Sequence, residues 1–518
     1  MFPTPFAHGE IGLIGKLERP RRLHYGTGYG SNMRTMPRQG QRTNLETTMF
    51  LIGLVVATLM GCNALTPESL HPDQFVSTSL PTPYTKLSQI AAAGTTPVML
   101  DSTLTPPDLS PTSTPLTQVT KPLGRPLPQA PLPLSAFPRP PQDNGLGIHW
   151  STHLHAQSIE ATSYFVSELT RMNIRWVKLL NDGVRGRAYD HTIEEMVSRG
   201  IMPVLRLYQR CNEPFDATQL EALVRHYVAK GVYYYELYNE PNLPGKPGGW
   251  CQKGGIPQPE YLAYIWAEAA RVIYQAGGYP SLPSMFAPSK KRVNWRQDFF
   301  YLFFDALRNQ GNTETLYFSW APIHNYNINH PPDYPFDEVN LTSRPLTQAE
   351  IERHQLTPEQ VAKINHARAT AREPGGYYVG DNLADDSTCF LHFIAWHDQF
   401  YELFGFTIPL ISTEGGATKG SGEDPRYPVV DGQTVAEWTL RQANYMLDAA
   451  PDYYFATMTW LLAQRALEYN EPNWEVNAWY HDREGDQEPV VETLKRRPRL
   501  HEVRRWPRGQ QEGKISLP

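Results

Sequence analysis

The chain has 518 residues, a formal net charge of −6 and four cysteines. This charge gives no basic field of the kind that nucleic-acid-binding proteins use, so we expect no nucleic-acid partner. Four cysteines are too few for a disulfide-built scaffold, and an aromatic content of 12% suits both a deep core and a sugar-stacking surface.

The first recognisable segment is the apolar run from Met49 to Met60. It has the length of a signal-peptide core and falls short of the ~20 residues that span a bilayer. The run ends in Leu-Met-Gly-Cys62, which resembles the lipobox of bacterial lipoproteins. The resemblance implies that residues 1–62 are an N-terminal extension with a lipoprotein-type signal peptide, and that Cys62 is lipidated. The alternative is a plain secretory signal or an uncleaved anchor; in each case we expect an exported protein, either a cell-surface lipoprotein or a secreted one.

Residues 63–143 are dominated by Thr, Pro, Ser and Leu. Proline at this density, mixed with small polar residues, favours an extended tether over a packed core. We therefore predict a disordered Pro/Thr/Ser-rich linker between the membrane and a globular body that begins at Asn144.

From residue 144 to residue 485, short apolar segments alternate with amphipathic ones. This alternation predicts parallel strands joined by right-handed crossover helices. The predicted strands are 146–150, 174–179, 201–207, 232–238, 282–287, 316–323, 408–413 and 455–461. The predicted helices are 156–172, 192–198, 218–230, 259–276, 295–309 and 388–403. Because eight is the strand number of a (β/α)8 TIM barrel, we predict that fold.

The crossover after the sixth predicted strand is unusually long, spanning residues 325–386. Within it, Thr357-Pro-Glu-Gln360 predicts a helix start with proline in the first turn and a capping glutamine. We expect this insertion to form a lid or a substrate-side wall, and the alternative is a decoration that does not touch the substrate. Residues 486–518 are expected to form a closing helix and a charged tail.

Two predicted strands run into glutamates: the fourth into Asn239-Glu240, and the seventh into Glu414 followed by two glycines. The carboxyl ends of barrel strands point into the shared mouth where this architecture carries out chemistry. A pair of carboxylates there suits glycosidic bond cleavage, in which one protonates the leaving oxygen and the other attacks the anomeric carbon. For Glu414 the alternative is a structural carboxylate, neutralised by Lys419 or capping a helix.

The tripeptide Asn-Glu-Pro occurs three times, beginning at Asn212, Asn239 and Asn470. Glu213 lies several residues past the third predicted strand, and Glu471 lies in a loop well past the eighth. Only Glu240 follows its strand directly, so its context selects it as the proton donor.

Over roughly residues 145–479 the chain resembles the clan A retaining glycoside hydrolases, such as families 5 and 39. The resemblance rests on the Asn-Glu after the fourth strand and the Glu after the seventh. It implies a (β/α)8 barrel in which Glu240 is the acid/base and Glu414 is the nucleophile. It also implies that Asn239 holds the sugar 2-hydroxyl near the nucleophile.

Further strand-end residues match the same clan. His324-Asn-Tyr326 resembles the His-x-Tyr of the clan, whose tyrosine hydrogen-bonds the nucleophile. Trp460 is placed like the aromatic floor under the sugar, where an indole ring packs against C–H faces. We therefore assign His324, Tyr326 and Trp460 to substrate binding.

Two positions depart from the clan pattern. Lys178 stands on the second strand where an arginine is common, and Arg206 stands on the third where family 5 often has a histidine. Since lysine and arginine are not equivalent at a bidentate site, the family within the clan stays open. We assign Lys178 and His149 to substrate binding, with His149 pointing into the sugar site.

Cysteines and histidines suggest two further sites. Cys211 and Cys251 each follow a predicted strand on the same face, so export permits a disulfide between them; the alternative is that they and Cys389 are separate buried thiols. His153 and His155 resemble the paired histidines of metal-dependent barrel hydrolases. They lie past the end of the first strand, and strands four and five offer no matching ligands, so we predict no metal and no cofactor.

Together these features predict an exported, lipid-anchored glycoside hydrolase that cleaves a β-linked polysaccharide or oligosaccharide with retention, acting as a monomer. One alternative is a non-catalytic surface glycan-binding protein on a degenerate barrel. Another is a transglycosylase that uses the same residues. The sugar, the linkage and endo or exo action stay open.

Overall fold

The computed structural model describes residues 124–242, 258–285, 295–373, 383, 386, 388–469 and 472–497. The predicted signal segment, its Cys62, the linker up to residue 123 and Cys251 lie outside these residues. Within the described part, no helix is both long and apolar enough to cross a bilayer.

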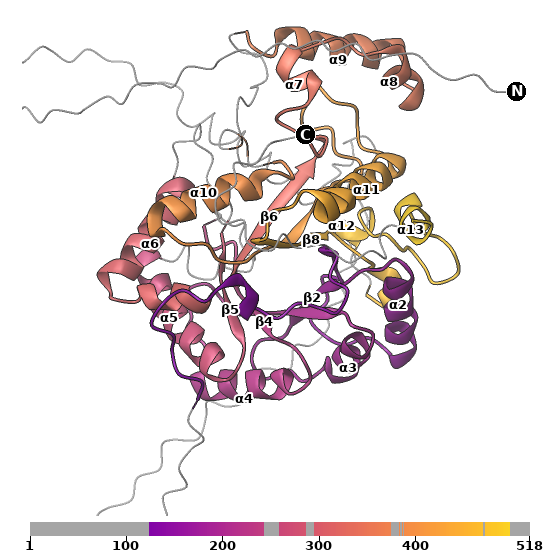
Figure 1. Ribbon diagram of the computed structural model, residues 1–518. Coiled ribbons are helices and arrows are strands. Elements are labelled where there is room, and N and C mark those ends of the chain that lie inside the picture. Colours follow the sequence, from indigo (N-terminus) through magenta and orange to yellow (C-terminus); the bar gives the residue numbers. More distant parts are fainter. Residues whose placement is uncertain are drawn as a thin grey trace, which may run out of the picture. The chain divides into compact units, whose positions relative to one another are not determined.

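Eight parallel strands surround the core (Figure 1). They are β1 (Leu146–His149), β2 (Trp176–Asn181), β3 (Met202–Leu207), β4 (Tyr234–Asn239), β5 (Tyr279–Ser284), β6 (Ala321–Ile328), β7 (Leu410–Ala417) and β8 (Tyr454–Thr459). Neighbours pair in the order β5-β4-β3-β2-β1-β8-β7-β6, and a parallel bridge between Ser281 and Trp320 joins the two edges. The predicted (β/α)8 barrel is therefore the observed fold.

Helices cover the outside of the strands. They are α2 (Ile159–Arg171), α3 (Asp190–Ser198), α4 (Ala217–Val228), α5 (Pro259–Gln275), α6 (Trp295–Asn309), α10 (His392–Phe404) and α11 (Gly432–Asp448). Two further helices follow β8: α12 (Pro472–Glu475) and α13 (Pro489–Lys495), which packs against α11. Short 3-10 turns are η1 (Leu134–Ala136), η2 (Thr313–Phe318) and η3 (Arg465–Leu467). In α4, the buried side chains are Leu220, Leu223, Val224 and Tyr227. This is the helical spacing that makes one face apolar and directs it to the barrel.

The eight strands occur in the predicted order, but α11, which links β7 to β8, was not among the predicted helices, and several ends differ. The largest shift is in β6, which was expected at 316–323 and begins at Ala321 because the preceding apolar run forms η2. An apolar run does not distinguish a buried turn from a strand. The strand also continues to Ile328, so the long insertion starts later than residue 325. Trp460, expected within the eighth strand, follows its end.

The described part of the predicted linker, residues 124–143, does not stay free of the barrel. Phe137 is buried, with its ring 4.8 Å from that of Tyr279. The hydroxyls of Tyr234 and Tyr279 donate to the carbonyls of Pro138 and Ala136 at 2.6 and 2.7 Å. Because both tyrosines begin their strands, this segment lies against the amino-terminal end of the barrel. This segment packs on the barrel because it carries apolar side chains among its prolines, such as Leu132, Leu134 and Phe137.

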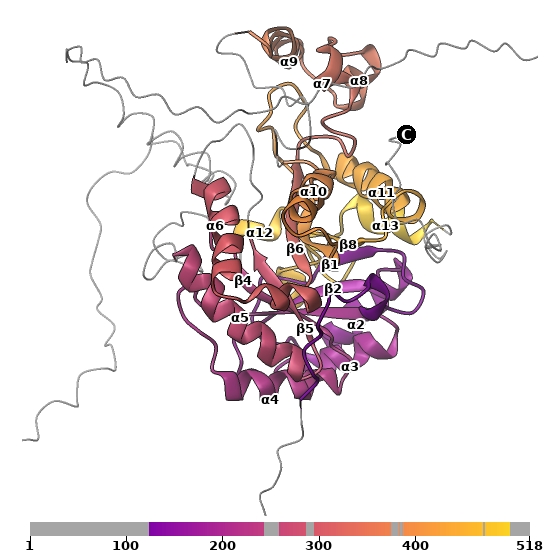
Figure 2. The same ribbon diagram turned by 60° about the vertical axis from the view of Figure 1, so that its left-hand side comes forward.

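The long insertion carries α7 (Glu338–Thr342), α8 (Gln348–Arg353) and α9 (Pro358–Thr370). The capping box predicted at the start of α9 is confirmed, since the Thr357 and Gln360 side chains each bond the other's backbone. Figures 1 and 2 both show these helices grouped beyond the carboxyl end of β6. Arg353 binds Asp431 at 3.0 Å, at the start of α11. Whether this insertion walls the substrate stays a prediction.

Candidate active site

Side chains from six strands, and from the residues just past β4 and β8, meet at the carboxyl end of the barrel. They are His149 of β1, Lys178 of β2, Arg206 of β3, Glu236 and Asn239 of β4, His324 and Tyr326 of β6, Glu414 of β7, and, just past β4 and β8, Glu240 and Trp460. Each of the eight residues predicted for the catalytic and sugar-binding site contacts another residue of this group. The barrel thus brings together residues that are up to several hundred positions apart in the sequence.

The two predicted catalytic glutamates lie side by side. A carboxylate oxygen of Glu240 and one of Glu414 lie within 4.8 Å of each other and of a ring nitrogen of His324. The His324 Nδ1 is 2.8 Å from Glu240 Oε1 and 3.7 Å from Glu414 Oε2. The Glu240 side chain is 19% exposed and that of Glu414 is 10% exposed. Both carboxylates are therefore held in a largely dry site that keeps some access from the mouth.

Glu414 is held as an anion by donors on both oxygens. Lys178 Nζ and Arg206 Nη1 reach its Oε1 at 2.9 and 3.2 Å, and the Tyr326 hydroxyl donates to its Oε2 at 3.0 Å. Burial alone would raise the pKa of Glu414, but the charges of His324, Lys178 and Arg206 outweigh it and hold that pKa well below its usual range. An ionised carboxylate at neutral pH is what a nucleophile requires.

Glu240 is presented by an unusual backbone. Its φ is 44°, in the left-handed region that non-glycine residues rarely adopt. Its amide donates to the Ser284 carbonyl at 2.8 Å, which ties the residue after β4 to the end of β5. Backbone strain of this kind persists only where the surroundings enforce it, and it is concentrated at functional sites.

The His324 ring lies against this glutamate, with its Nδ1 2.8 Å from Glu240 Oε1. Burial lowers the pKa of His324, but the charge of Glu414 and the hydrogen bond to Glu240 raise it, and the net pKa lies above the ordinary value of 6.5. The His324 ring is therefore easier to protonate than a free imidazole, and it lies beside the carboxylate of Glu240.

An aromatic wall adjoins the carboxylates. The His149 ring lies 4.4 Å from the Trp460 ring, and Trp474 of α12 meets Trp460 edge-on at 5.3 Å. Burial and the charge of Lys178 hold the pKa of His149 well below its usual range, so its ring is neutral. Among the described residues, neither ring nitrogen of His149 nor the Trp460 indole nitrogen has a hydrogen-bond partner. Buried polar atoms of this kind are suited to pair with ligand hydroxyls.

Two charged residues of the site were not among the predicted site residues. Arg206 donates to Asn239 Oδ1 at 2.8 Å as well as to Glu414, and Glu236 accepts from Lys178 at 2.9 Å. A usable signal was present, because Lys178, Arg206 and Glu236 each interrupt an otherwise apolar strand. Opposite charges inside buried strands must pair with one another.

The structure also locates residues that the sequence offered as alternatives or as further sites. Lys419 pairs with Glu488 and does not neutralise Glu414. Glu213, of the first Asn-Glu-Pro, pairs with Arg210 at 3.0 Å outside the site, and the third copy, at residues 470 and 471, lies outside the described residues. Cys211 is in a disulfide, but its predicted partner Cys251 is also outside them; Cys389 is a free buried thiol.

The cluster of Glu240, His324 and Glu414 has the composition of a metal site. Its surroundings do not suit a cation, because Lys178 and Arg206 already bring positive charge to Glu414. The His153 ring, by contrast, stacks on Tyr469 at 4.3 Å, apart from this cluster.

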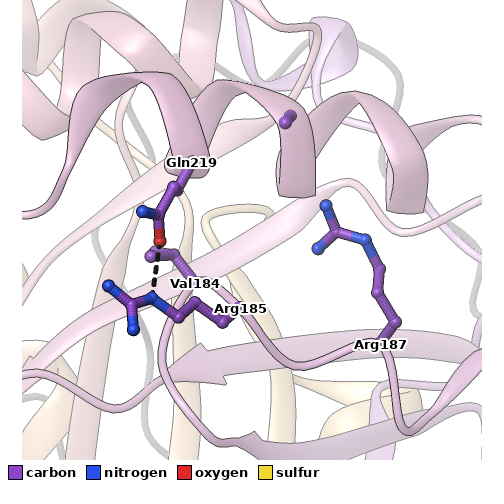
Figure 3. Close-up of a pocket in the computed structure, with 5 residues that line it drawn as sticks. Val184, Arg185, Arg187 and Gln219 are labelled. Atoms are coloured by element: carbon purple, nitrogen blue, oxygen red, sulfur yellow. Dashed lines mark hydrogen bonds between the residues drawn. The ribbon is translucent and has the colours of Figure 1, made fainter.

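The structure has a cavity of about 280 Å³ away from the carboxylates. Figure 3 shows it between the segment after β2 and helix α4, where Arg185 donates to Gln219 at 2.9 Å and Arg187 lies opposite. Its lining holds no carboxylate and no nucleophile. We place no chemistry there.

No protein-family model matches the chain, and no curated protein matches it. Among solved structures, a GH128 endo-β-1,3-glucanase from Pseudomonas viridiflava is 13% identical over 69% of this chain and 98% of its own, with a TM-score of 0.39. A β-xylosidase from Caulobacter crescentus is 13% identical over 69% and 68%, with a TM-score of 0.36. An endo-β-1,4-mannanase from Thermotoga petrophila is 12% identical over 70% and 77%, with a TM-score of 0.36. Similarity at this level carries no argument, and both clan A membership and the family within it stay predictions.

Proposed function

We propose that this protein is a glycoside hydrolase that cleaves β-linked glycans with retention of configuration. The observation that carries the proposal is the carboxylate pair of Glu240 and Glu414, with oxygens within 4.8 Å of each other. Retaining enzymes hold their two carboxyl groups about 5 to 5.5 Å apart, whereas inverting enzymes need about 6.5 to 9.5 Å to admit a water. The β-specificity rests on the sequence resemblance alone.

In the first step, a Glu414 oxygen attacks the anomeric carbon and forms a glycosyl ester. The bond from that carbon to the leaving oxygen breaks, and this oxygen takes the proton held by Glu240 and His324. In the second step, Glu240 takes a proton from water, the water oxygen attacks the same carbon, and Glu414 leaves as a carboxylate. Two inversions give net retention.

The neighbouring residues support this sequence of steps. Tyr326 and Arg206 hold the Glu414 carboxylate in place, and Asn239 is positioned through Arg206. The aromatic wall of His149 and Trp460 supplies a face for the sugar ring and polar atoms for its hydroxyls. We further propose, on the sequence signals alone, that the enzyme is exported and held at the cell surface through Cys62.

The test is release of reducing sugar by the full chain from a panel of β-glycans and aryl β-glycosides. We expect activity on at least one substrate, and a loss of at least about 100-fold in Glu240→Gln and Glu414→Gln. Glu213→Gln is the matched control, since it alters the same tripeptide outside the site and should keep full activity. Silence across the panel, or full activity in either site variant, would overturn the proposal.

A further inference from the structure

A third glutamate lies beneath the catalytic pair. Glu236 is four residues before Glu240 on β4 and is fully buried. Its Oε1 accepts from Lys178 Nζ at 2.9 Å and from the Ser284 hydroxyl at 2.8 Å. Its Oε2 has no partner among the described residues. An incompletely satisfied buried carboxylate is costly to stability, so its presence calls for a role beyond packing.

Lys178 links this glutamate to the nucleophile. The same ammonium donates to Glu414 Oε1 at 2.9 Å, and its side chain is 0% exposed. Lys178 is therefore shared between two carboxylates and cannot turn to solvent if it loses one of them. With Arg206 as the second cation, the two carboxylates Glu236 and Glu414 balance the charge of this layer.

This balance changes during the reaction described above, on which the inference rests. When Glu414 forms the glycosyl ester, it loses its negative charge, and Lys178 loses one of its two partners. A buried ammonium without a counter-charge is strongly unfavourable. Glu236 takes no part in the ester, so its ion pair with Lys178 at 2.9 Å remains in the intermediate.

We propose that Glu236 is a positioning residue that acts through Lys178: it draws part of the Lys178 charge away from Glu414 before attack and holds that charge after the ester forms. Without Glu236, Lys178 would bind Glu414 alone. The full Lys178 charge would then stabilise the free Glu414 carboxylate, whose negative charge is lost during the attack. The ester would then be harder to form. Its hydrolysis would not be slowed, because it restores the carboxylate beside Lys178.

The test separates the two steps in Glu236→Gln with a dinitrophenyl β-glycoside of an accepted sugar. For the native enzyme we expect a rapid burst of dinitrophenolate followed by a slower steady rate. In Glu236→Gln the burst should slow by about 10- to 100-fold, while breakdown of the isolated glycosyl-enzyme stays within about 3-fold or becomes faster. Damage to the fold alone would slow both steps together.

Two further variants keep the test decisive. Glu236→Asp keeps the carboxylate but places it farther from Lys178, because the aspartate side chain is shorter. Its burst rate should therefore lie between those of the native enzyme and Glu236→Gln. This variant decides the matter if Glu236→Gln does not fold. Glu168→Gln is the matched control. Glu168 lies on α2, outside the site, and its buried carboxylate binds Lys495 at 2.5 Å, so this variant also removes a buried carboxylate from a lysine. It should lower stability and leave both steps unchanged.

The outcomes are distinguishable. Parallel loss of both steps in the Glu236 variants, or an unchanged burst, would overturn this inference and leave the proposed function standing. A native enzyme that cleaves no β-glycoside and forms no glycosyl-enzyme would overturn both.

Discussion

At the scale of single residues, the site gives different surroundings to two glutamates that are close neighbours. Glu414 is surrounded by cations and a phenol, whereas Glu240 has the His324 ring at 2.8 Å. Pairs of titratable groups with divergent surroundings mark acid and nucleophile roles. The chemistry of the site therefore depends on which neighbours each carboxylate has.

The His324 ring gives a pH prediction. When two coupled groups share one remaining proton, the pair loses it with an apparent pKa at least as high as the pKa of either group for that proton. Because the pKa of His324 is raised above 6.5, kcat/KM should fall only as the pH rises through a value above 6.5. In His324→Asn the amide can keep the hydrogen bond to Glu240 but cannot hold the proton, so the alkaline limb should move to lower pH.

The measurement is a pH profile of kcat/KM on a substrate with a poor leaving group. A dinitrophenyl glycoside of the same sugar is the control, because its departure needs little help from an acid and its alkaline limb should change less. An unshifted limb in His324→Asn would contradict the shared-proton account.

The residues that could be predicted are those with a strand-end signature. Asn239-Glu240 and Glu414 each follow or end an apolar strand, and parallel strands bring such ends together. Glu236 and Arg206 were missed because they lie inside strands and not at strand ends; Lys178, also inside a strand, was assigned through the clan resemblance. Which partners they meet depends on strand register: Arg206 lies level with Glu236 across β3 and β4, yet it bonds Glu414 while Glu236 bonds Lys178, and sequence periodicity does not supply that register.

At the scale of elements, the end of β7 shows how the barrel aims Glu414. Gly416 has a φ of 90°, and a Cβ there would lie 2.6 Å from Thr459 Cγ2 of β8. Glycine is thus required both for the backbone conformation and for the close approach of the next strand. These two constraints fix the strand two residues after the nucleophile.

Gly416→Ala should therefore lower the free energy of unfolding by about 2 to 4 kcal/mol, combining backbone strain with overpacking. Gly420→Ala is the matched control. It has a φ of 82° but nothing within 4 Å of the added carbon, so it should lose only the strain, about 1 kcal/mol. Urea denaturation measures the free energy of unfolding of both variants. Equal decreases would show that the structure accommodates the added carbon beside Thr459 without further loss of stability, which would contradict this account.

The order of the strands and of most helices could be predicted because the hydrophobic period and the composition change sharply between strands and helices, but α11 was not predicted. Their ends could not always be. The run around Leu316 has the composition of a strand, yet it forms the turn η2, and β6 pairs with β7 from Ala321 onward. Pairing partners, which lie far away in the sequence, set where a strand begins.

At the scale of the whole molecule, the insertion is fastened to the barrel by a buried polar cluster. Asp424 is 1% exposed and accepts from His330 at 3.0 Å and from Arg426 at 2.6 Å. Arg426 in turn donates to Asn340 of α7 at 2.8 Å. A network that connects the end of β6, the loop after β7 and α7 fixes the insertion through charge as well as apolar contact.

Asp424→Asn should cost about 3 to 5 kcal/mol at pH 7, since it leaves a buried arginine without its carboxylate. Burial raises the pKa of Asp424, but the bonds from His330 and Arg426 bring it below the ordinary 3.8. Its contribution is therefore present above pH 3.8 and is lost as the pH falls through the lowered value. The deficit of the variant should shrink in acid.

Denaturation at pH 7 and at pH 3 checks this expectation. Glu338→Gln is the control from the same insertion: its carboxylate is 67% exposed and binds Arg344, so its removal should change stability by less than about 1 kcal/mol at either pH. A deficit in Asp424→Asn that grows in acid would contradict the account.

The most direct test of the central claim is chemical trapping of the nucleophile. A 2-deoxy-2-fluoro β-glycoside with a dinitrophenyl leaving group, built on a sugar that the enzyme accepts, should form a stable glycosyl ester. Mass spectrometry of the digested protein should place one adduct per chain on Glu414. An adduct on any other residue, or turnover of accepted substrates to the inverted anomer with no adduct, would contradict the retaining pair of Glu240 and Glu414.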